Sequence, residues 1–194
     1  MLVAVSFIAG YLIGSFSSAI IVCRMLGLGD PRLSGSGNPG TTNVLRLGGK
    51  RAAALTLVGD VLKGTLPVAA VHQISGDPVV IAAVALACFL GHLYPLYYGF
   101  KGGKGVATAI GVYLGIDLIL AGGVIAAWLG IAGVTRIASL SSLMSMLVAP
   151  GLAWTLAKDD PIILASIVIF LFVCATHTSN IKRLLAGEES KINL

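Results

Sequence analysis

The segment GSGNPGTTNVLR, residues Gly35 to Arg46, combines glycines with neutral and basic hydrogen-bond donors. Glycines let backbone N–H groups approach an anion closely, and Arg46 supplies a planar guanidinium that suits phosphate. The neutral donors of this first segment are Ser36, Asn38, Thr41, Thr42 and Asn43. Two interpretations stand for the segment taken alone: a phosphate-binding loop, or an ordinary polar turn between helices, since glycine, proline and asparagine are turn formers.

The first segment also fits the pattern G-x-G-x-x-G at Gly35, Gly37 and Gly40, with Asp60 twenty positions after Gly40. That pattern indicates a dinucleotide site only between the strand and the helix of a βαβ unit. Here long apolar stretches stand on both sides, and Asp60 falls inside the second of them. The context excludes a dinucleotide fold and leaves only the affinity of the glycines for an anion.

The second segment, GHLYPLYYGFKGGKGVAT, runs from Gly91 to Thr108. We expect Gly102, Gly103 and Gly105 to form another anion-binding nest, with Lys104 beside it at the start of a helix. It is not a Walker A loop, because GFKGGKG has three residues where four are needed, and glycine replaces the Ser or Thr that would hold magnesium. For His92, one residue into a membrane run, the sequence favours a hydrogen-bonded packing role over a catalytic one.

The third segment, THTSNIKRLLAGEESK, runs from Thr176 to Lys191 and follows the last apolar run. His177 and Asn180 are spaced i, i+3, so they share one face if the helix continues. They would supply a group that titrates near neutral pH and an amide that can hold a hydroxyl. The alternative is a simple membrane anchor, with its basic residues at lipid head groups and both Glu188 and Glu189 in solvent.

Three further polar features carry weaker signals. TRIASLSSL, residues 135–143, places Arg136, Ser139, Ser141 and Ser142 together, although serines in membrane helices usually bond their own backbone. Asp60 and Lys63, at i, i+3 inside the membrane, are predicted to neutralise each other. HQISGD, residues 72–77, fits the H-x-x-x-x-D spacing of many lipid acyltransferases but falls on the opposite face, and we interpret it as a chance match.

The composition requires elements that cross a membrane. Of 194 residues, 57% are hydrophobic and 11% charged, with a mean hydropathy of +0.97, whereas about a quarter of the residues of soluble domains are charged. The uncharged stretch from Leu2 to Cys23 lacks a basic start and a cleavage site, which predicts a retained helix. Cys23, Cys88 and Cys174 are widely spaced in apolar runs and are predicted to be free thiols, without metal-type spacing.

The apolar runs lie at residues 2–23, 52–72, 79–98, 106–120, 122–134, 139–157 and 162–175. Region 105–135 is too short for two full spans and long for one, since a span needs roughly 20 residues. If it crosses twice, as short helices bent near Asp117 and Gly122–Gly123, nearly all basic residues share one side, as short cytoplasmic loops require. We therefore predict an all-α polytopic bundle with seven crossings, amino terminus outside and carboxyl terminus inside.

The predicted bundle is one integral membrane domain, residues 1–194, with cytoplasmic loops at 30–51, 99–106, 135–142 and 176–194. The net charge of +5 is explained by this basic rim. No alternation of aromatic and basic residues suggests nucleic-acid binding.

The three segments together resemble the PlsY family of bacterial membrane glycerol-3-phosphate acyltransferases, which use acyl phosphate as donor. The third segment carries the pattern H-x-x-N-I-x-R-L-L-x-G-x-E, and the order, spacing and length agree over essentially the whole chain. GDVLKG at residues 59–64 and SLSS at 139–142 are similar to the family as well.

The resemblance implies transfer of an acyl group from acyl phosphate to the 1-hydroxyl of sn-glycerol 3-phosphate, giving lysophosphatidic acid and phosphate for phospholipid synthesis. It implies a multi-pass protein of the bacterial cytoplasmic (inner) membrane, surrounded by membrane lipids, with the active site facing the cytoplasm. Since a mixed anhydride is already activated, we expect no metal, no cofactor and no covalent acyl-serine.

The resemblance also assigns roles to residues of this chain. The catalytic set is Ser36, Arg46, Lys104, His177 and Asn180. The substrate- and phosphate-binding set is Gly37, Asn38, Gly40, Thr41, Asn43, Gly102, Gly103, Gly105, Ser142 and Glu188. Either His177 or a substrate phosphate oxygen would accept the hydroxyl proton.

A membrane transporter for small anions or phosphate esters is the alternative function, because it too needs helix-terminal nests and basic residues. Its sites would lie near the bilayer midplane, whereas these segments gather at one face. A purely structural membrane scaffold explains neither glycine-rich segment.

Overall fold

The computed structural model describes residues 1–156 and 158–192, and these residues form helices without strands. The elements are α1 (Leu2–Gly14), α2 (Ser18–Met25), α3 (Thr41–Ile74), α4 (Pro78–Leu93), the short 3-10 helix η1 (Leu96–Tyr98), α5 (Val106–Ile116), α6 (Leu118–Thr135), α7 (Ala138–Thr155), α8 (Asp160–Thr176) and α9 (Thr178–Leu185). The predicted all-α membrane bundle is confirmed.

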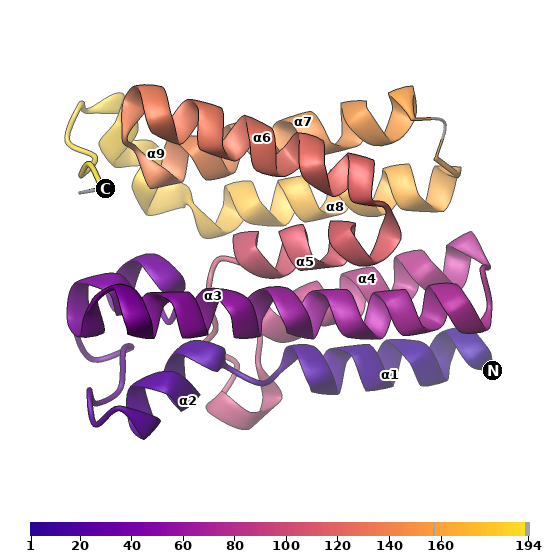
Figure 1. Cartoon of the computed structure of the whole chain (residues 1–194), viewed down its shortest axis with the longest axis horizontal. Coiled ribbons are helices and arrows are strands. Elements are labelled where there is room, and N and C mark those ends of the chain that lie inside the picture. The colour runs from indigo at the N-terminus through magenta and orange to yellow at the C-terminus, as the bar shows by residue number, and fades with distance from the viewer. Residues whose placement is uncertain (157, 193–194) are drawn as a thin grey trace.

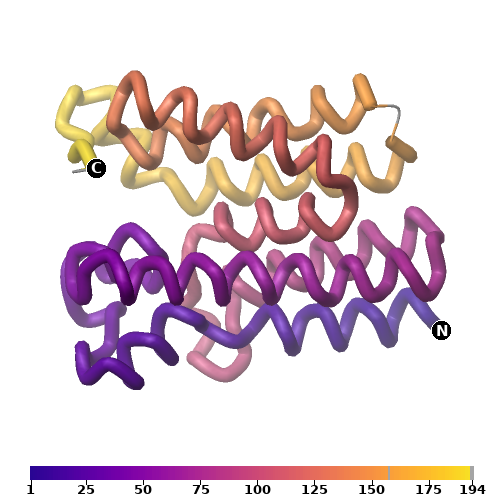
Figure 2. Tube along the Cα trace, viewed as in Figure 1, coloured from indigo at the N-terminus to yellow at the C-terminus, as the bar shows by residue number. Residues whose placement is uncertain are grey.

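The helices form two layers with α5 between them (Figure 1). One layer holds α1, α3 and α4, with α1 packed on α4, and the other holds α6, α7 and α8 in sequence. Helix α5 packs on α3 in the first layer and on α6 in the second. The amino terminus lies at one end of the bundle, and α9 with the following segment lies at the other (Figure 2).

Among the residues that the structure describes, five helical stretches are long and apolar enough to cross a membrane, and the bent pair α8 and α9 makes a sixth if it forms one span. Helix α5 has only 11 residues. It runs back against α6, so region 105–135 forms two antiparallel helices as expected (Figure 2). Seven crossings, and which side each end faces, stay predictions.

The reversal of the chain between α5 and α6 occurs at Asp117 alone, because α6 continues without a break through Gly122 and Gly123. Asp117 is extended, with φ −162° and ψ 129°. Its Oδ1 accepts hydrogen bonds from the N–H groups of Ile119 and Leu120, at 2.8 Å each, which caps α6. Lys158 Nζ pairs with the other oxygen at 2.7 Å, which ties this turn to the start of α8.

Helix α3 begins much earlier than the apolar pattern indicated. The residues from Thr41 onward are helical, although the sequence predicted a loop over 30–51 and a span from 52. The two parts of α3 meet at a kink at Gly49, whose φ of 72° is the left-handed conformation that glycine adopts without strain. The kink turns the last part of the first segment into a separate helical arm that carries Arg46.

Glycines bring α3 and α5 into backbone contact in the centre of the bundle. A Cβ on Gly64 would lie 2.5 Å from the carbonyl oxygen of Thr108, and a Cβ on Gly111 would overlap the backbone of Val61. Small residues at facing positions are the usual means of close packing between membrane helices. Cys23, Cys88 and Cys174 are free thiols, as predicted.

Candidate active site

The glycines of the second segment are held tightly by the end of α4. Gly102 N–H donates to the carbonyl of Leu93 and Gly103 N–H donates to that of His92, both at 3.2 Å. A Cβ on Gly102 would overlap these carbonyl groups. The sequence predicted that the N–H groups of Gly102 and Gly103 cradle an anion, but both are occupied; these glycines allow a close approach of the loop to α4.

In the second segment, the backbone groups suited to attract an anion are those at the start of α5. Gly105 is the residue before the helix, with φ 86°. The N–H groups of the first helical turn have no partner within the helix, which makes this terminus attractive to negative charge. Lys104 directly precedes Gly105, so an ammonium group and a helix start occur together.

Lys104 connects the second segment to the third. Its Nζ donates a hydrogen bond to Asn180 Oδ1, and its carbonyl accepts one from Thr176 Oγ1 at 3.3 Å. Burial lowers the pKa of Lys104, the charge of Glu189 raises it, and the charges of Arg183 and Arg46 lower it, with a net decrease. The ammonium group of Lys104 therefore lies near two positive charges, Arg183 and Arg46, and one negative charge, Glu189, which suits it to bind an anion.

His177 occupies a bend of 66° between α8 and α9. From the sequence, His177 and Asn180 were expected to share one face only if the helix continued through them. The chain turns at His177, so Asn180 lies on the separate helix α9. His177 Nδ1 lies 2.8 Å from the carbonyl of Val173, and the side chain is 3% exposed. Because this carbonyl can only accept, the proton is on Nδ1 and Nε2 is a free acceptor.

The charge state of His177 follows from its environment. Burial lowers its pKa to about 4, and the positive charge of Lys104 contributes to the decrease. The imidazole is therefore neutral at physiological pH. A neutral ring with Nε2 unprotonated can accept a hydrogen bond from a substrate hydroxyl.

Glu189 lies at the centre of a polar cluster with Ser139, Asn180 and Arg183, and it was not among the site residues predicted from the sequence. Its Oε1 accepts hydrogen bonds from Asn180 Nδ2 at 2.5 Å and Ser139 Oγ at 2.7 Å, and Oε2 accepts from Arg183 Nε at 2.6 Å. Burial raises its pKa, but these hydrogen bonds outweigh burial, and the net pKa lies below the usual value. The predicted residue, Glu188, is exposed.

The signal for Glu189 was present in the pattern H-x-x-N-I-x-R-L-L-x-G-x-E. Aligned on His177 and Asn180, the final G-x-E of that pattern corresponds to Gly187 and Glu189. The third segment therefore folds back on itself through this carboxylate. Because Ser139 belongs to α7, the same group joins the segment to the second layer of the bundle.

Asn43 organises the first segment and does not face open space. Its side chain is 2% exposed. Its Oδ1 accepts from the N–H of Ser36 at 2.9 Å, and its Nδ2 donates to the carbonyls of Pro31 at 2.9 Å and Ser34 at 3.0 Å. All of these bonds hold the loop on α3, so the structure gives Asn43 a supporting position where the sequence predicted a phosphate contact.

Arg32, which precedes the first segment, contacts the second segment and was also missed. It pairs with Asp30 at 2.6 Å, and its Nη1 donates to the carbonyl of Tyr98 at 2.9 Å. Such a contact between distant loops leaves no mark in a single sequence.

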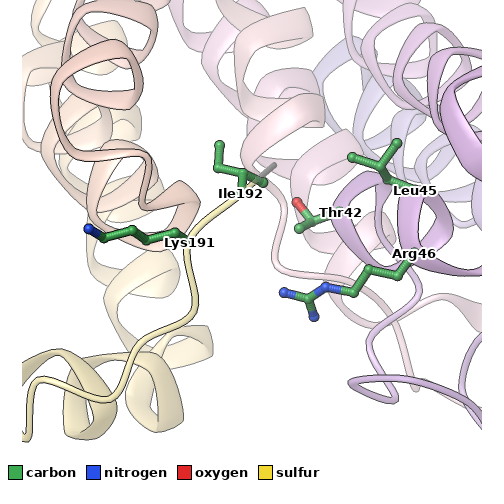
Figure 3. A pocket seen from close by; sticks show the side chains of 5 residues that line it. All are labelled: Thr42, Leu45, Arg46, Lys191 and Ile192. Carbon is green, nitrogen blue, oxygen red and sulfur yellow. The ribbon is translucent and has the colours of Figure 1, made fainter. Parts of the chain in front are cut away.

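Arg46 borders a cavity of about 210 Å³ together with Thr42, Leu45, Lys191 and Ile192. Its guanidinium extends toward the C-terminal tail, which we define as residues 186–192, whereas the side chain of Lys191 points away from the cavity (Figure 3). Arg46 Nη2 donates to Ser190 Oγ at 3.1 Å. The tail is also fixed by a hydrogen bond of 2.7 Å from the N–H of Ile192 to the carbonyl of Arg136.

The remaining predicted residues divide between the loop surface and the helix interior. Ser36 and Gly37 are exposed, Asn38 is half-buried and Gly40 precedes α3. Thr41 opens α3, and its buried hydroxyl has no hydrogen-bond partner among the described residues. Ser142 Oγ donates to the carbonyl of Ala138 at 2.8 Å and accepts from Trp128 Nε1 at 3.2 Å, so its hydroxyl is occupied by contacts within α6 and α7.

The chain that carries this polar cluster matches one protein family over almost its whole length. A family model described as glycerol-3-phosphate acyltransferase matches residues 4–187. The chain belongs to this family. The glycerol-3-phosphate acyltransferase of Thioalkalivibrio sulfidiphilus is 51% identical over 193 residues, covering 99% of this chain and 95% of the relative. That of Hydrogenovibrio crunogenus is 50% identical over 187 residues, covering 95% and 90%.

Two solved structures are similar to this chain along its length. Both are of PlsY (YgiH), an integral membrane glycerol 3-phosphate acyltransferase. The glycerol 3-phosphate form has a TM-score of 0.94 at 36% identity and covers 98% of this chain and 96% of the other. The lysophosphatidic acid form has a TM-score of 0.93 at 35% identity and covers 98% and 95%. The chain is an integral membrane acyltransferase of phospholipid synthesis.

Proposed function

We propose that the protein transfers a fatty acyl group from acyl phosphate to the 1-hydroxyl of sn-glycerol 3-phosphate, releasing lysophosphatidic acid and inorganic phosphate. The observation that carries this proposal is the contact between Lys104 and Asn180 beside the neutral ring of His177. It combines, at one end of a membrane bundle, a cation for phosphate, an amide for a hydroxyl and an acceptor for the hydrogen bond of the attacking hydroxyl.

The polar groups of the site and the apolar helix faces suit different parts of the two substrates. Both carry phosphate, and the basic groups of Arg46 and Lys104 with the start of α5 provide complementary charge. The acyl chain would lie among the apolar helix faces, with its reactive carbonyl near the cluster. Fixing both reactants in this way supplies much of the rate enhancement for an already activated donor.

The hydroxyl of glycerol 3-phosphate attacks the acyl carbonyl carbon, a C–O bond forms, and the bond from the carbonyl to the phosphate oxygen breaks. His177 Nε2 accepts the hydrogen bond of the attacking hydroxyl and orients it. With a pKa of about 4, His177 is a weak base. We therefore assign the proton to an oxygen of the departing phosphate, which leaves as inorganic phosphate. Lys104 stabilises the negative charge that develops in the transition state.

The test uses detergent-purified protein, acyl phosphate and labelled glycerol 3-phosphate. We expect lysophosphatidic acid and inorganic phosphate in equal amounts, with no added metal. Parallel reactions with acyl-coenzyme A or with the acyl thioester of acyl carrier protein in place of acyl phosphate test the donor. Product from one of those donors, without product from acyl phosphate, would overturn the proposed donor.

The same assay separates acyl transfer from transport, because a detergent solution has no compartments. Uptake of labelled glycerol 3-phosphate into protein-containing vesicles, with no lysophosphatidic acid formed in any assay, is the result that would favour a transporter. Asp117→Asn, at the opposite end of the bundle, serves as a matched variant that should leave turnover unchanged.

A further inference from the structure

A buried polar network in the first layer of the bundle has no part in the chemistry described so far. Asp60 is 2%, His92 6% and Lys63 8% exposed. Lys63 Nζ lies 2.8 Å from Asp60 Oδ1, which confirms the predicted ion pair, and His92 Nδ1 lies 3.6 Å from the same oxygen. Charged groups at this depth are costly, so membrane proteins retain them mainly where they serve a function.

The network connects three parts of the fold. Asp60 and Lys63 are on α3 and His92 is in the last turn of α4. Lys63 Nζ also donates to the carbonyl of Phe16 at 2.7 Å, in the break between α1 and α2. The lysine therefore satisfies a backbone group that the interrupted helix leaves open.

The other side of the network touches the loop that carries Lys104. A Cβ on Gly103 would overlap His92 Nε2 and would lie 3.1 Å from the carbonyl oxygen of Pro39. The carbonyl of His92 accepts the hydrogen bond from Gly103 N–H at 3.2 Å. The imidazole ring therefore lies between Asp60 on one side and the glycine loop, residues 101–105, on the other.

Gly103 also lies near the first segment, because a Cβ on it would lie 3.1 Å from the carbonyl oxygen of Pro39, which immediately precedes Gly40, the residue before α3. A displacement of His92 would consequently move the glycine loop and the start of the helical arm with Arg46. Reacting groups that move by about 1 Å can lose 100-fold in rate.

We propose that Asp60, Lys63 and His92 are positioning residues that hold the glycine loop against α4 and so place Lys104 in contact with Asn180. Asp60 borders the ring of His92 through a polar contact of 3.6 Å, which is longer than a hydrogen bond. Lys63 balances the charge of Asp60, and the other edge of the His92 ring packs against Gly103. None of the three touches substrate. The inference rests on the proposed function in assuming that Lys104 acts in turnover.

The first test is a double-mutant cycle between His92 and Lys104. His92→Ala should lower kcat/KM on the order of 10- to 100-fold in the wild-type background. In the Lys104→Ala background the same substitution should cost less than about twofold, because residues that act as a unit are not additive. An equal loss in both backgrounds would overturn the proposal, since a general structural defect does not depend on Lys104.

The second test removes the ion pair without leaving one charge buried alone. The double variant Asp60→Asn, Lys63→Met keeps the side-chain volumes similar and avoids the large cost of an unpaired charge. We expect it to remain folded and to reduce kcat/KM in the same direction as His92→Ala. Asp117→Asn breaks an ion pair of 2.7 Å at the other end of the bundle and is the control. Wild-type kcat/KM in the folded double variant would contradict the positioning role.

A third measurement does not depend on turnover. Reductive methylation followed by mass spectrometry reports how accessible the amine of Lys104 is. We expect faster methylation of Lys104 in His92→Ala than in the wild type, and no change in Asp117→Asn. An inactive wild type would refute the proposed function, whereas unchanged methylation of Lys104 in His92→Ala would refute the positioning network.

Discussion

His177 makes a prediction in which the stability of the protein depends on pH. Its pKa falls from 6.5 to about 4 in the folded protein, first because it is buried and then because Lys104 is near. Below pH 6.5 the unfolded chain takes up a proton that the folded chain does not. The stabilisation is therefore present in full above pH 6.5 and is lost as pH falls from there through the folded pKa.

The size of the effect follows from the two pKa values. At pH 5 the loss attributable to His177, relative to pH 8, is about 2 kcal/mol. For a chain of this length that corresponds to roughly 4 to 8 °C in the melting temperature. His177→Gln removes the titrating group, so its melting temperature should fall less between pH 8 and pH 5 than that of the wild type.

The assay is thermal unfolding of both proteins in one detergent at pH 8 and pH 5. His72→Gln, at the other end of α3, is the matched control and should behave like the wild type. Equal falls in melting temperature for the wild type and His177→Gln would refute the assignment of a neutral, buried imidazole. The corresponding kinetic expectation is that protonation of His177 produces no step in kcat/KM between pH 6 and pH 8.

Three further predictions address the surrounding groups. Glu189→Ala should lower the melting temperature more than Glu189→Gln, because the amide oxygen of glutamine can still accept hydrogen bonds from Asn180 and Ser139 at about 1 kcal/mol each, whereas alanine has no acceptor; equal melting temperatures would contradict this. Arg46→Ala should reduce kcat/KM on the order of 10- to 100-fold through loss of a charged hydrogen bond to phosphate, whereas Lys50→Ala, an exposed change just beyond the kink at Gly49, should not; unchanged kinetics in Arg46→Ala would remove Arg46 from the phosphate site. In intact cells, a membrane-impermeant thiol reagent should label Ser75→Cys but not Ser190→Cys, and the reverse pattern would invert the predicted orientation.

The helical framework was predictable because it depends on apolar periodicity and on few polar interruptions. Asp117 was the only charged residue between Gly105 and Thr135, and the chain reverses there. The bend expected near Asp117 and Gly122–Gly123 lies at Asp117 and does not include the two glycines, because glycine tolerates a break but does not require one inside an apolar helix. The early start of α3 was missed because residues 41–51 are mostly polar and do not form an apolar run like the one that predicted the rest of the helix.

The site was only partly predictable, because contacts between distant loops depend on the fold. Lys104 and Asn180 were selected by residue type and come together. The roles of the glycines changed, since Gly102 and Gly103 donate their N–H groups to α4. Glu189 was missed because the sequence does not show which of the adjacent residues Glu188 and Glu189 points into the cluster. The course of the backbone decides this.

The shortness of α5 determines the depth at which the proposed reaction occurs. Its 11 residues extend for about 16 Å, roughly half of a hydrocarbon layer of about 30 Å. The glycine loop lies inboard of α9 and of the start of α3, as Figure 1 shows. For the proposed substrates, the fatty donor would meet Lys104 without being lifted out of the bilayer. The water-soluble acceptor would have to descend to it, so the lipid product would form at a level from which it can move sideways into the membrane.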